Sequence, residues 1–286
     1  VDILNSKIKY FLKFFILIFI LIFIYSVAIE PSLLIVKKYN ISENGALIKN
    51  DTIESKSESV KVVQISDTQI GSFYSTKNLK KVANKINTLN PDIIVFTGDL
   101  IDYSNKNPSV DEITTILSSM NARLGKFSVF GNHDYMYKLP RYYRQIMKNS
   151  NFNLLVNENK KIKLKDDKYI NILGVDEILN GNPNIKYLES QIDNKSFNLL
   201  LAHEPDLVDM LSKDTMNLVL SGHSHGGQIR LPIKGALVTP PYGRKYTKGF
   251  YDINGNHLYV SSGLGSTKLP FRFFNIPEII EFNIII

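Results

Sequence analysis

Five short apolar runs in this chain each end directly in a polar cluster of Asp, Asn, His and Gly. The clusters are Asp67, Gly98-Asp99, Gly131-Asn132-His133-Asp134, His203 and Gly222-His223-Ser224-His225. Apolar runs of four to eight residues are typical of buried strands, and ligands of open α/β sheets gather at the carboxyl ends of strands. The chain is therefore expected to fold so that these five points converge in one place.

The segments around these runs predict a mixture of strands and helices. Apolar side chains at helical spacing in residues 76–89 lie between strands expected at 60–66 and 92–97, which predicts a strand–helix–strand unit and hence a parallel sheet. We expect further helices at 110–120 and 142–148, and further strands at about 127–130, 169–174, 197–202, 217–221, 228–231, 257–261 and 277–283. This mixture indicates an α/β architecture with one sheet packed on another.

The histidines are concentrated in the polar clusters. Four of the five lie there, and we expect the fifth, His257, to be an ordinary strand residue. The two imidazoles of His223 and His225 alternate along the chain and so would lie on one side of an extended segment. Imidazoles and carboxylates suit Mn, Fe, Zn or Co, whereas a chain without cysteine has neither thiolate metal sites nor disulfides.

This set of ligands favours hydrolysis of a phosphoester. One carboxylate can bridge two divalent ions, and such a pair of ions holds the attacking and leaving oxygens of a phosphoryl transfer. Two ions, two carboxylates and a hydroxide leave a net positive site that attracts an anionic ester. A glycosidase that used carboxylates alone would not need four histidines. The net charge of +7 is not gathered into a basic block, so we expect no nucleic-acid partner.

The N-terminal part of the chain predicts a membrane segment. Residues 1–13 form a short basic flank, and residues 14–29 are uncharged and apolar, ending at Glu30 and Pro31. Two interpretations are open: an uncleaved transmembrane anchor with the rest of the chain outside the cytoplasm, or a signal segment that is cleaved near Ala28, so that the protein is secreted. Residues 30–59 are expected to be a linker or exposed hairpin, and residues 60–286 to be the catalytic domain.

Taken together and in this order, the clusters resemble the calcineurin-like metallophosphoesterase family. That family's motifs are Asp-x-His, Gly-Asp, Gly-Asn-His-Asp or Glu, a later His, and Gly-His-x-His. Additional segments are similar to a bacterial, membrane-associated YkuE-type subgroup. These segments are Gly222 to Pro232, Gly263 to Gly265, Leu269 to Arg272 and Pro277 to Ile279.

The resemblance implies a four-layer α/β/β/α sandwich of two mixed sheets. It also implies two divalent metal ions and hydrolysis of a phosphomonoester or phosphodiester by a metal-bound hydroxide. The expected membrane segment adds the expectation that this ester is lipid-linked or envelope-linked. His133 would contact the phosphoryl oxygen or protonate the leaving group. The first metal would be held by Asp67, Asp99 and His225, and the second by Asp99, Asn132, His203 and His223.

One position departs from the family pattern, because Gln69 stands where a histidine is usual. An amide offers only a neutral oxygen or an N–H donor, so Gln69 is expected either to bind the first metal weakly or to orient its ligands. This departure also leaves open a catalytically weak or inactive metal-binding or phosphate-binding module. Candidate contacts to the substrate are Arg244, Lys268 and Arg272.

Overall fold

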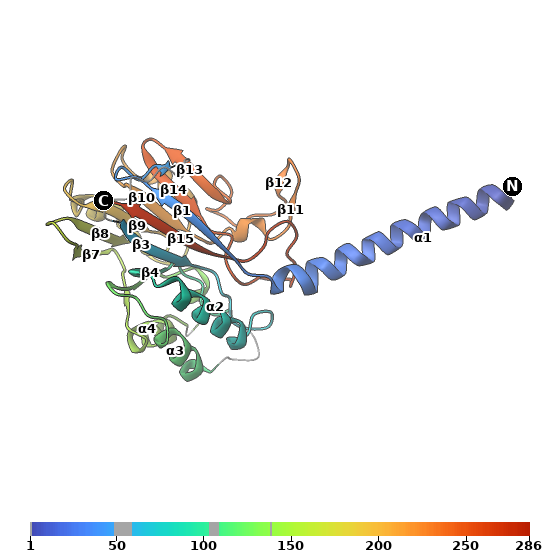
Figure 1. The fold of residues 1–286 in the computed structure, drawn as a ribbon, viewed down its shortest axis with the longest axis horizontal. Helices are drawn as coiled ribbons and strands as arrows, with labels where there is room; N and C mark the ends of the chain where they lie inside the picture. The colour runs from blue at the N-terminus through green and yellow to red at the C-terminus, as the bar shows by residue number, and fades with distance from the viewer. Residues whose placement is uncertain (1, 49–58, 103–108, 138) are drawn as a thin grey trace.

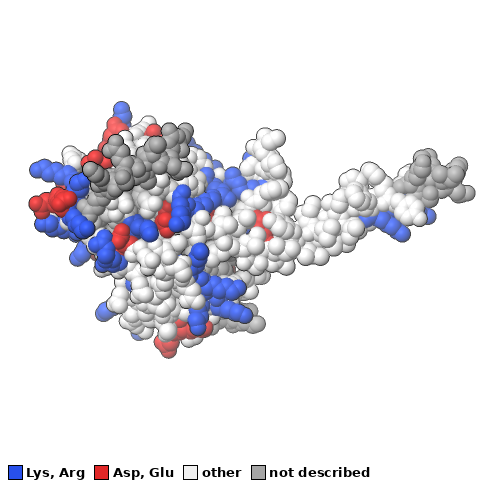
Figure 2. All heavy atoms as spheres, viewed as in Figure 1, with Lys and Arg blue, Asp and Glu red and all other residues white. Residues whose placement is uncertain are grey.

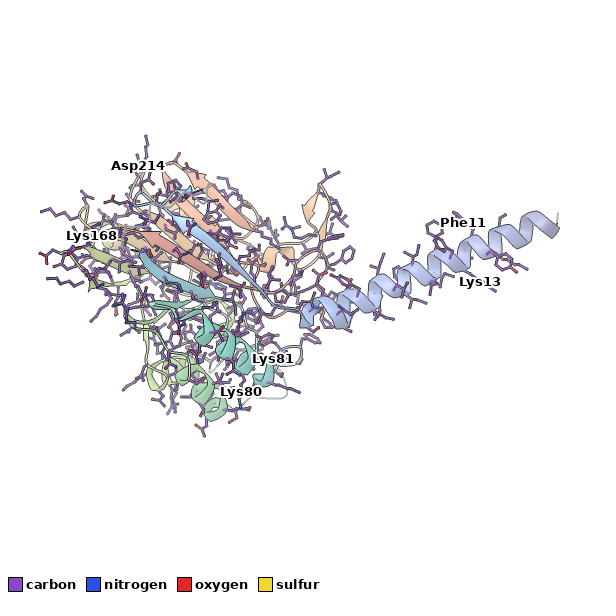
Figure 3. All side chains as sticks on the ribbon, viewed as in Figure 1. Phe11, Lys13, Lys80, Lys81, Lys168 and Asp214 are labelled. Carbon is purple, nitrogen blue, oxygen red and sulfur yellow. The ribbon has the colours of Figure 1, made fainter. Side chains whose placement is uncertain are left out.

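The computed structural model describes residues 2–48, 59–102, 109–137 and 139–286. Figure 1 shows a two-sheet body from which one long helix, α1 (Asp2–Ile24), projects to one side. Phe11 and Lys13 lie on the projecting part of that helix (Figure 3). Residues 8–32 are long and apolar enough to cross a membrane, by length and composition only.

The larger sheet has seven strands in the order β2-β1-β15-β3-β4-β5-β6. Strands β3, β4, β5 and β6 are parallel neighbours, whereas β15 is antiparallel to β3 and parallel to β1. The sheet is therefore mixed. Its strands are β1 (Ile35–Ile41), β2 (Leu47–Ile48), β3 (Ser59–Ile65), β4 (Ile93–Phe96), β5 (Gly125–Ser128), β6 (Phe152–Leu154) and β15 (Glu278–Ile285).

The second sheet has six strands in the order β13-β14-β10-β9-β8-β7, with parallel strands at its centre. A separate two-stranded hairpin joins β11 to β12. The strands are β7 (Glu158–Lys163), β8 (Tyr169–Gly174), β9 (Phe197–Leu201), β10 (Leu218–Ser221), β11 (Arg230–Leu231), β12 (Gly235–Ala236), β13 (Gly249–Ile253) and β14 (Asn256–Val260).

Helices cover the outer faces of both sheets. One apolar cluster joins the larger sheet to α2 (Thr76–Leu89), α3 (Val110–Ser118) and α4 (Leu139–Asn149) (Figure 1). A second cluster fills the space between the sheets, and a third joins the smaller sheet to α5 (Ile185–Ser190) and η4 (Pro205–Met210). Alternate residues of one strand, such as Val62 and Val63, serve different clusters because successive side chains of a strand point to opposite faces. The predicted α/β fold of two mixed sheets with flanking helices is confirmed.

Helix α2 begins and ends where its sequence predicts. The side chain of Ser75 accepts a hydrogen bond from the Asn78 N–H, which satisfies one of the free donors of the first turn. Asn90 ends the helix in the left-handed conformation that asparagine tolerates. The buried face consists of the five apolar residues that set the helical spacing: Leu79, Val82, Ala83, Ile86 and Leu89.

The segment expected to be a linker or exposed hairpin contains a strand of the larger sheet. Strand β1 pairs with β15 along its whole length, from Ile35 opposite Glu278 to Ile41 opposite Ile284. It also forms a hairpin with β2, and Ile41 is fully buried. The sheet therefore begins before residue 60, which corrects the expected domain boundary. Residues 49–58 of the same segment lie outside the described residues.

The base of α1 is fixed to the body by buried polar contacts. After η1 (Tyr25–Ile29) the chain turns through η2 (Glu30–Ser32) into β1. Glu30 is fully buried, and its carboxylate accepts hydrogen bonds from the backbone N–H groups of Phe274 (3.1 Å) and Asn275. The backbone N–H of Arg272 donates to the Ser26 carbonyl at 2.9 Å. The helix is thus joined to the segment that follows Gly265 through specific hydrogen bonds.

Candidate metal centre

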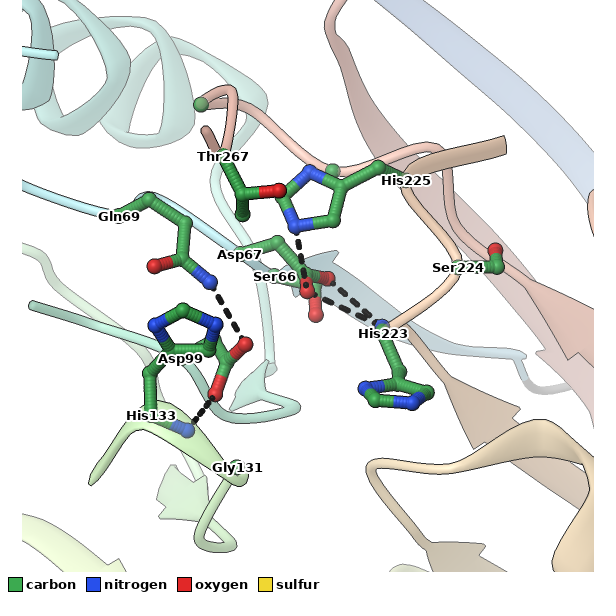
Figure 4. Close-up of polar contacts among 12 residues, drawn as sticks. Ser66, Asp67, Gln69, Asp99, Gly131, His133, His223, Ser224, His225 and Thr267 are labelled. Atoms are coloured by element: carbon green, nitrogen blue, oxygen red, sulfur yellow. Dashed lines mark hydrogen bonds and ion pairs between the residues drawn. The ribbon is translucent and has the colours of Figure 1, made fainter. Parts of the chain in front are cut away.

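Side chains from the two sheets meet where five strands end. Asp67 and Asp99 follow the parallel neighbours β3 and β4, and the Gly131–Asp134 turn follows β5. From the other sheet, His203 follows β9, and the turn that begins at Gly222 follows β10. Because these strands end at one edge of the sandwich, their polar termini converge. Figure 4 shows Asp67, Asp99, His133, His223 and His225 around this point.

Two glycines allow these turns to come close enough. A Cβ atom at Gly131 would lie 2.2 Å from Oδ1 of Asp99, and a Cβ atom at Gly222 would lie 2.2 Å from Oδ2 of Asp67. Any side chain there would push a carboxylate out of position. Both glycines are therefore needed in the site, because the absence of a side chain leaves room for the two carboxylates.

Five non-glycine residues of the site have a left-handed backbone. The φ angles are 52° at Asp67, 48° at Gln69, 62° at Asp99, 65° at His223 and 49° at His225. This conformation is uncommon for residues with a side chain and costs roughly 1–3 kcal/mol each where it is strained. Such backbone is characteristic of functional sites, because the surrounding fold holds the side chains in directions that an isolated loop would not adopt.

Asp99 lies at the centre of the cluster. Its Oδ2 accepts a hydrogen bond from Gln69 Nε2 at 2.6 Å, and its Oδ1 accepts one from the His133 backbone N–H at 2.8 Å. Burial favours the neutral acid, but the nearby His203 and His133 outweigh it and hold the pKa of Asp99 below its usual range. A carboxylate has about four lone-pair positions, so each oxygen of Asp99 keeps one that no hydrogen bond uses.

Asp99 is shared by two groups of potential metal ligands. It lies with His203 and His223 in one group and with Asp67 and His225 in the other, and within each group the ligand atoms are within 4.8 Å of one another. All five residues are buried. Burial raises the pKa of Asp67 to about 6, with His203 opposing this shift and the negative charge of Asp99 adding to it. Two adjacent buried carboxylates repel each other and are stable in their charged forms only if positive charge lies between them.

The imidazole rings are oriented by backbone carbonyl groups. Nδ1 of His203 donates to the Thr97 carbonyl at 2.6 Å, which leaves Nε2 directed at Asp99, 3.3 Å from its Oδ2. Nε2 of His223 donates to the Pro241 carbonyl at 2.8 Å, which leaves Nδ1 free. Metal-binding histidines are usually fixed in this way, because the second nitrogen's hydrogen bond determines which nitrogen is available.

Several ligand atoms of the cluster have no hydrogen-bond partner among the described residues. They are Gln69 Oε1, Asn132 Oδ1, His203 Nε2 and both ring nitrogens of His225, and all are buried. An unpaired buried polar atom is costly, so a group of them around two carboxylates fits divalent cations that would complete their coordination. The donors are oxygen and nitrogen only, as the sequence predicts.

His133 lines the cavity beside this cluster but belongs to neither ligand group. Its Nδ1 lies 3.1 Å from Oδ1 of Asp102. Burial alone would lower the pKa of His133, but the carboxylates of Asp99 and Asp102 raise it to about 9. Sequence reasoning did not identify Asp102, although its place three residues after the Gly-Asp motif is a signal that could have been used.

Asp134 is a second residue whose role the motif does not reveal. Its buried carboxylate accepts hydrogen bonds from the backbone N–H groups of Gly131 (2.9 Å), Asp99 (2.7 Å) and Leu100 (3.0 Å). It thereby joins the turn after β4 to the turn after β5. Its function is to position Asp99 relative to Asn132 and His133.

The Gly222–Gly226 turn also has the Gly-x-Ser-x-Gly spacing of serine hydrolases. Here the hydroxyl of Ser224 donates to the Thr247 carbonyl at 2.7 Å and accepts from the Gly226 N–H at 3.1 Å. Both bonds are to backbone groups, so Ser224 shapes the turn that carries the two histidines and is not paired with a base.

The three basic residues predicted to contact the substrate have different environments. Lys268 is exposed and lines the cavity, whereas Arg244 is exposed but does not line it. Arg272 is fully buried, and its guanidinium donates to the carbonyl groups of Gly265, Asn275 (3.0 Å) and Ser262 (2.9 Å). The prediction for Arg272 is therefore wrong, because a fully buried side chain with its donors bound to carbonyls cannot reach a substrate.

The cavity over the cluster has a volume of about 530 Å³. Its polar lining includes Asp99, Asn132, His133 and the Gly222 turn's two histidines. Its apolar lining consists of Leu179, Ile229, Leu237, Val238, Leu269 and Phe271. The site can thus accommodate a charged group at the ligand cluster and an apolar group beside it.

Comparison with known protein families matches residues 60–227 to the family described as calcineurin-like phosphoesterase. The chain belongs to this family. It is 36% identical to the uncharacterized metallophosphoesterase YkuE of Bacillus subtilis over 91% of this chain and 88% of that protein. It is 30% identical to the uncharacterized metallophosphoesterase Cj0846 of Campylobacter jejuni over 91% of this chain and 71% of that protein. The predicted resemblance is thus confirmed.

A further relative is named for a specific reaction. The UDP-2,3-diacylglucosamine pyrophosphatase LpxG of Chlamydia muridarum is 28% identical over 77% of this chain and 82% of that protein. Members of the family use divalent metals, and membership together with this relative identifies the chain as a phosphoester hydrolase. Among the described residues, one helix is long and apolar enough to span a bilayer, and it suggests association with a membrane.

Proposed function

We propose that this hydrolase cleaves its phosphoester with two divalent ions held at the junction of the two sheets. The first ion would take Asp67, Asp99 and His225, and the second Asp99, Asn132, His203 and His223. What supports this most directly is the set of buried ligand atoms without hydrogen-bond partners around the two carboxylates. Gln69 would complete the first position weakly or orient Asp99.

The residues of the chain would contribute positioning and a dry environment. When bound, two divalent ions supply an activated water and offset the charge of the phosphoryl group. Asp99 has one unused lone pair on each oxygen and so can serve both positions. Because all the ligand carboxylates and imidazoles are buried, their interactions are weakened little by solvent.

His133 is proposed as the residue that contacts the reacting phosphoryl group. Asp102 binds its Nδ1, which leaves Nε2 for the cavity. A proton held at Nε2 can be donated to a phosphoryl oxygen or to the leaving oxygen. The Asp102 carboxylate, 3.1 Å from Nδ1, favours the protonated form that this role requires.

The substrate is proposed to be a phosphomonoester or phosphodiester, lipid-linked or envelope-linked, and Lys268 at the cavity wall a contact to it. The relative LpxG is named for a diacylated substrate, which supports the lipid-linked alternative. The catalytic domain would lie outside the cytoplasm, because Lys7, Lys9 and Lys13 precede the apolar segment. Cleavage of that segment would release the same domain.

Turnover of simple esters by the metal-depleted chain, with and without added Mn²⁺, tests the proposal. We expect Mn²⁺ to restore hydrolysis of an aryl phosphomonoester or diester, and His203→Asn to abolish the restoration. His257→Asn is the matched control, because His257 lies on β14 away from the clusters. Tight Mn²⁺ binding without hydrolysis of any ester would instead support the inactive binding module.

A further inference from the structure

An exposed apolar surface adjoins the cavity on the side of helix α1. We call it the apolar lip, and it comes from the segment around the β11–β12 hairpin and from the segment that follows Thr267. Its most exposed member is Ile233 at the hairpin tip, which is 110% exposed, and Val238 is 77% exposed. The apolar lip consists of Leu231, Ile233, Leu237, Val238, Leu269 and Phe274. Three of these, Leu237, Val238 and Leu269, also line the cavity.

The apolar lip is continuous with the base of the membrane helix. Phe271 and Phe273 contact Phe23 and Tyr25 of the N-terminal segment, with ring centroids 5.5 and 6.4 Å apart. In Figure 1 the β11–β12 hairpin projects on the same side of the body as α1, and in Figure 2 the projecting surface beside the helix is mostly uncharged. Helix base, lip and cavity therefore share one side of the molecule.

The hairpin is tied to the segment that contacts α1. The side chain of Gln228 exchanges two hydrogen bonds with the backbone of Thr267, at 2.8 and 3.1 Å. The Arg230 N–H donates to the Phe273 carbonyl at 2.9 Å. The lip consequently has a fixed place relative to the helix and does not depend on a flexible loop.

Ile233 is an unfavourable residue for a hairpin tip in water. Its φ is +70°, a conformation that a β-branched side chain rarely adopts and that glycine or asparagine would adopt more easily. Its side chain is fully exposed and therefore does not pack in the protein interior. An exposed isoleucine with this backbone conformation is explained if its side chain enters an apolar environment outside the protein.

The charges around the lip suit an anionic lipid surface. Residues 226–239, which contain the hairpin, include two basic residues, Arg230 and Lys234, and no Asp or Glu. Lys234 directly follows Ile233, and Lys268 directly precedes Leu269, so basic groups flank the apolar tips. Apolar side chains with adjacent basic residues are characteristic of segments that enter a membrane interface.

We propose that the apolar lip lies in the membrane interface beside α1 and that the cavity takes an amphiphilic phosphoester directly from the bilayer. The phosphoryl group would reach the ligand cluster while the apolar chain follows Leu237, Val238 and Leu269 to the lipid. The membrane is chosen as the occupant because the lip continues the surface of the membrane helix. The choice of substrate rests on the proposed function, whereas the position of the lip does not.

A single tryptophan tests the position of the lip without reference to activity. The chain contains no tryptophan, so Ile233→Trp introduces one fluorophore at the hairpin tip, and Tyr187→Trp on α5 is an exposed control outside the lip. In vesicles with anionic lipid, we expect brominated lipids to quench the hairpin-tip tryptophan and aqueous iodide to quench the control. Quenching of the hairpin-tip tryptophan by iodide alone would overturn the proposal. Protection from both quenchers would indicate a protein partner and also overturn it.

Activity measurements with the full chain in the same vesicles test the substrate class. We compare a phosphodiester that carries a long acyl chain with its short, soluble analogue, in the presence of Mn²⁺. Ile233→Asn combined with Leu231→Ser should lower hydrolysis of the long-chain ester about tenfold or more, since each buried apolar side chain contributes about a tenfold change in partitioning. Hydrolysis of the soluble ester should not change, and Tyr187→Ser should affect neither ester.

The failures of the two proposals can be told apart. Equal losses on both esters would refute a membrane-delivered substrate, because the variants would then act on the site itself. Lipid quenching of the hairpin-tip tryptophan without turnover of either ester would contradict the proposed function and support the position of the lip.

Discussion

Gln69 provides the sharpest test of the proposed metal centre, because it replaces the histidine usual in the family. The side chain is buried, its Nε2 donates to Asp99 at 2.6 Å, and its Oε1 has no hydrogen-bond partner among the described residues. The amide can therefore act through its nitrogen, by orienting the shared carboxylate, or through its oxygen, as a weak ligand. Gln69→Ala removes both functions.

The contacts give the size of the expected effect. A hydrogen bond to a charged group contributes about 1.5–3 kcal/mol, and 1.4 kcal/mol is a factor of ten in affinity. Gln69→Ala should thus weaken metal binding roughly 10- to 100-fold, the range also typical of residues that orient metal ligands. Gln69→His should raise the affinity and shift the preference from Mn²⁺ towards Zn²⁺ or Fe²⁺, because imidazole is the better donor to those ions.

Calorimetric titration of the metal-free variants with Mn²⁺ and Zn²⁺ measures both effects. Gln64→Ala is the matched control, because Gln64 is an equally buried glutamine of β3 whose amide binds Thr97 and Ser221 instead of Asp99. That variant should lose thermal stability but keep its metal affinity. If neither Gln69→Ala nor Gln69→His changes metal affinity or metal preference by more than about twofold, far less than the 10- to 100-fold typical of residues that orient metal ligands, Gln69 has no role at the metals.

Four further outcomes are expected. Asp99→Asn should reduce both metal content and activity, the latter at least about a hundredfold or about 3 kcal/mol, and near-normal metal content would argue against a shared carboxylate. His133→Asn should lower kcat roughly 10²- to 10⁴-fold while both metals stay bound, and the loss should be smaller for esters with good leaving groups. Equal losses of kcat for esters with good and poor leaving groups would exclude protonation of the leaving group by His133. Glu30→Ala should lower the melting temperature, because the buried Asn275 N–H and the partly buried Phe274 N–H lose their acceptor; the buried donor alone costs about 1–3 kcal/mol, and an unchanged melting temperature would show that α1 is not fixed there. A chain that begins at residue 33 should have a clearly higher melting temperature than one that begins at residue 60, which lacks β1. Equal melting temperatures would show that the folded domain begins at residue 60 after all.

Local patterns were sufficient to predict the turns that carry the candidate ligands and the helices α2, α3 and α4, whereas α5 was not predicted. Helix α2 has its apolar residues at helical spacing between a serine cap and a left-handed asparagine, so its bounds follow from the sequence alone. The candidate ligands were recognisable because each follows an apolar run and because histidine is rare in this chain.

The remaining features depend on contacts between distant segments. Strand β1 contains Lys37, Lys38 and Asn40 and so resembles a polar linker, and its partner β15 lies 243 positions away at Glu278 opposite Ile35. The environment of Arg272 depends on three carbonyl groups that only the folded chain brings around it. No periodicity in the sequence records either arrangement.

The position of β15 determines when the larger sheet can form. This strand lies between β1 and β3, yet it follows every other strand of the sheet along the chain. During synthesis, β1 and β3 therefore emerge long before the strand that joins them, and native pairing waits for residues 278–285. Contacts between such distant segments form slowly, because a long loop must close first. In a chain built in this way, strands β3 to β6 and the whole second sheet can pair earlier, whereas β1 can join the larger sheet only after residues 278–285 have been made.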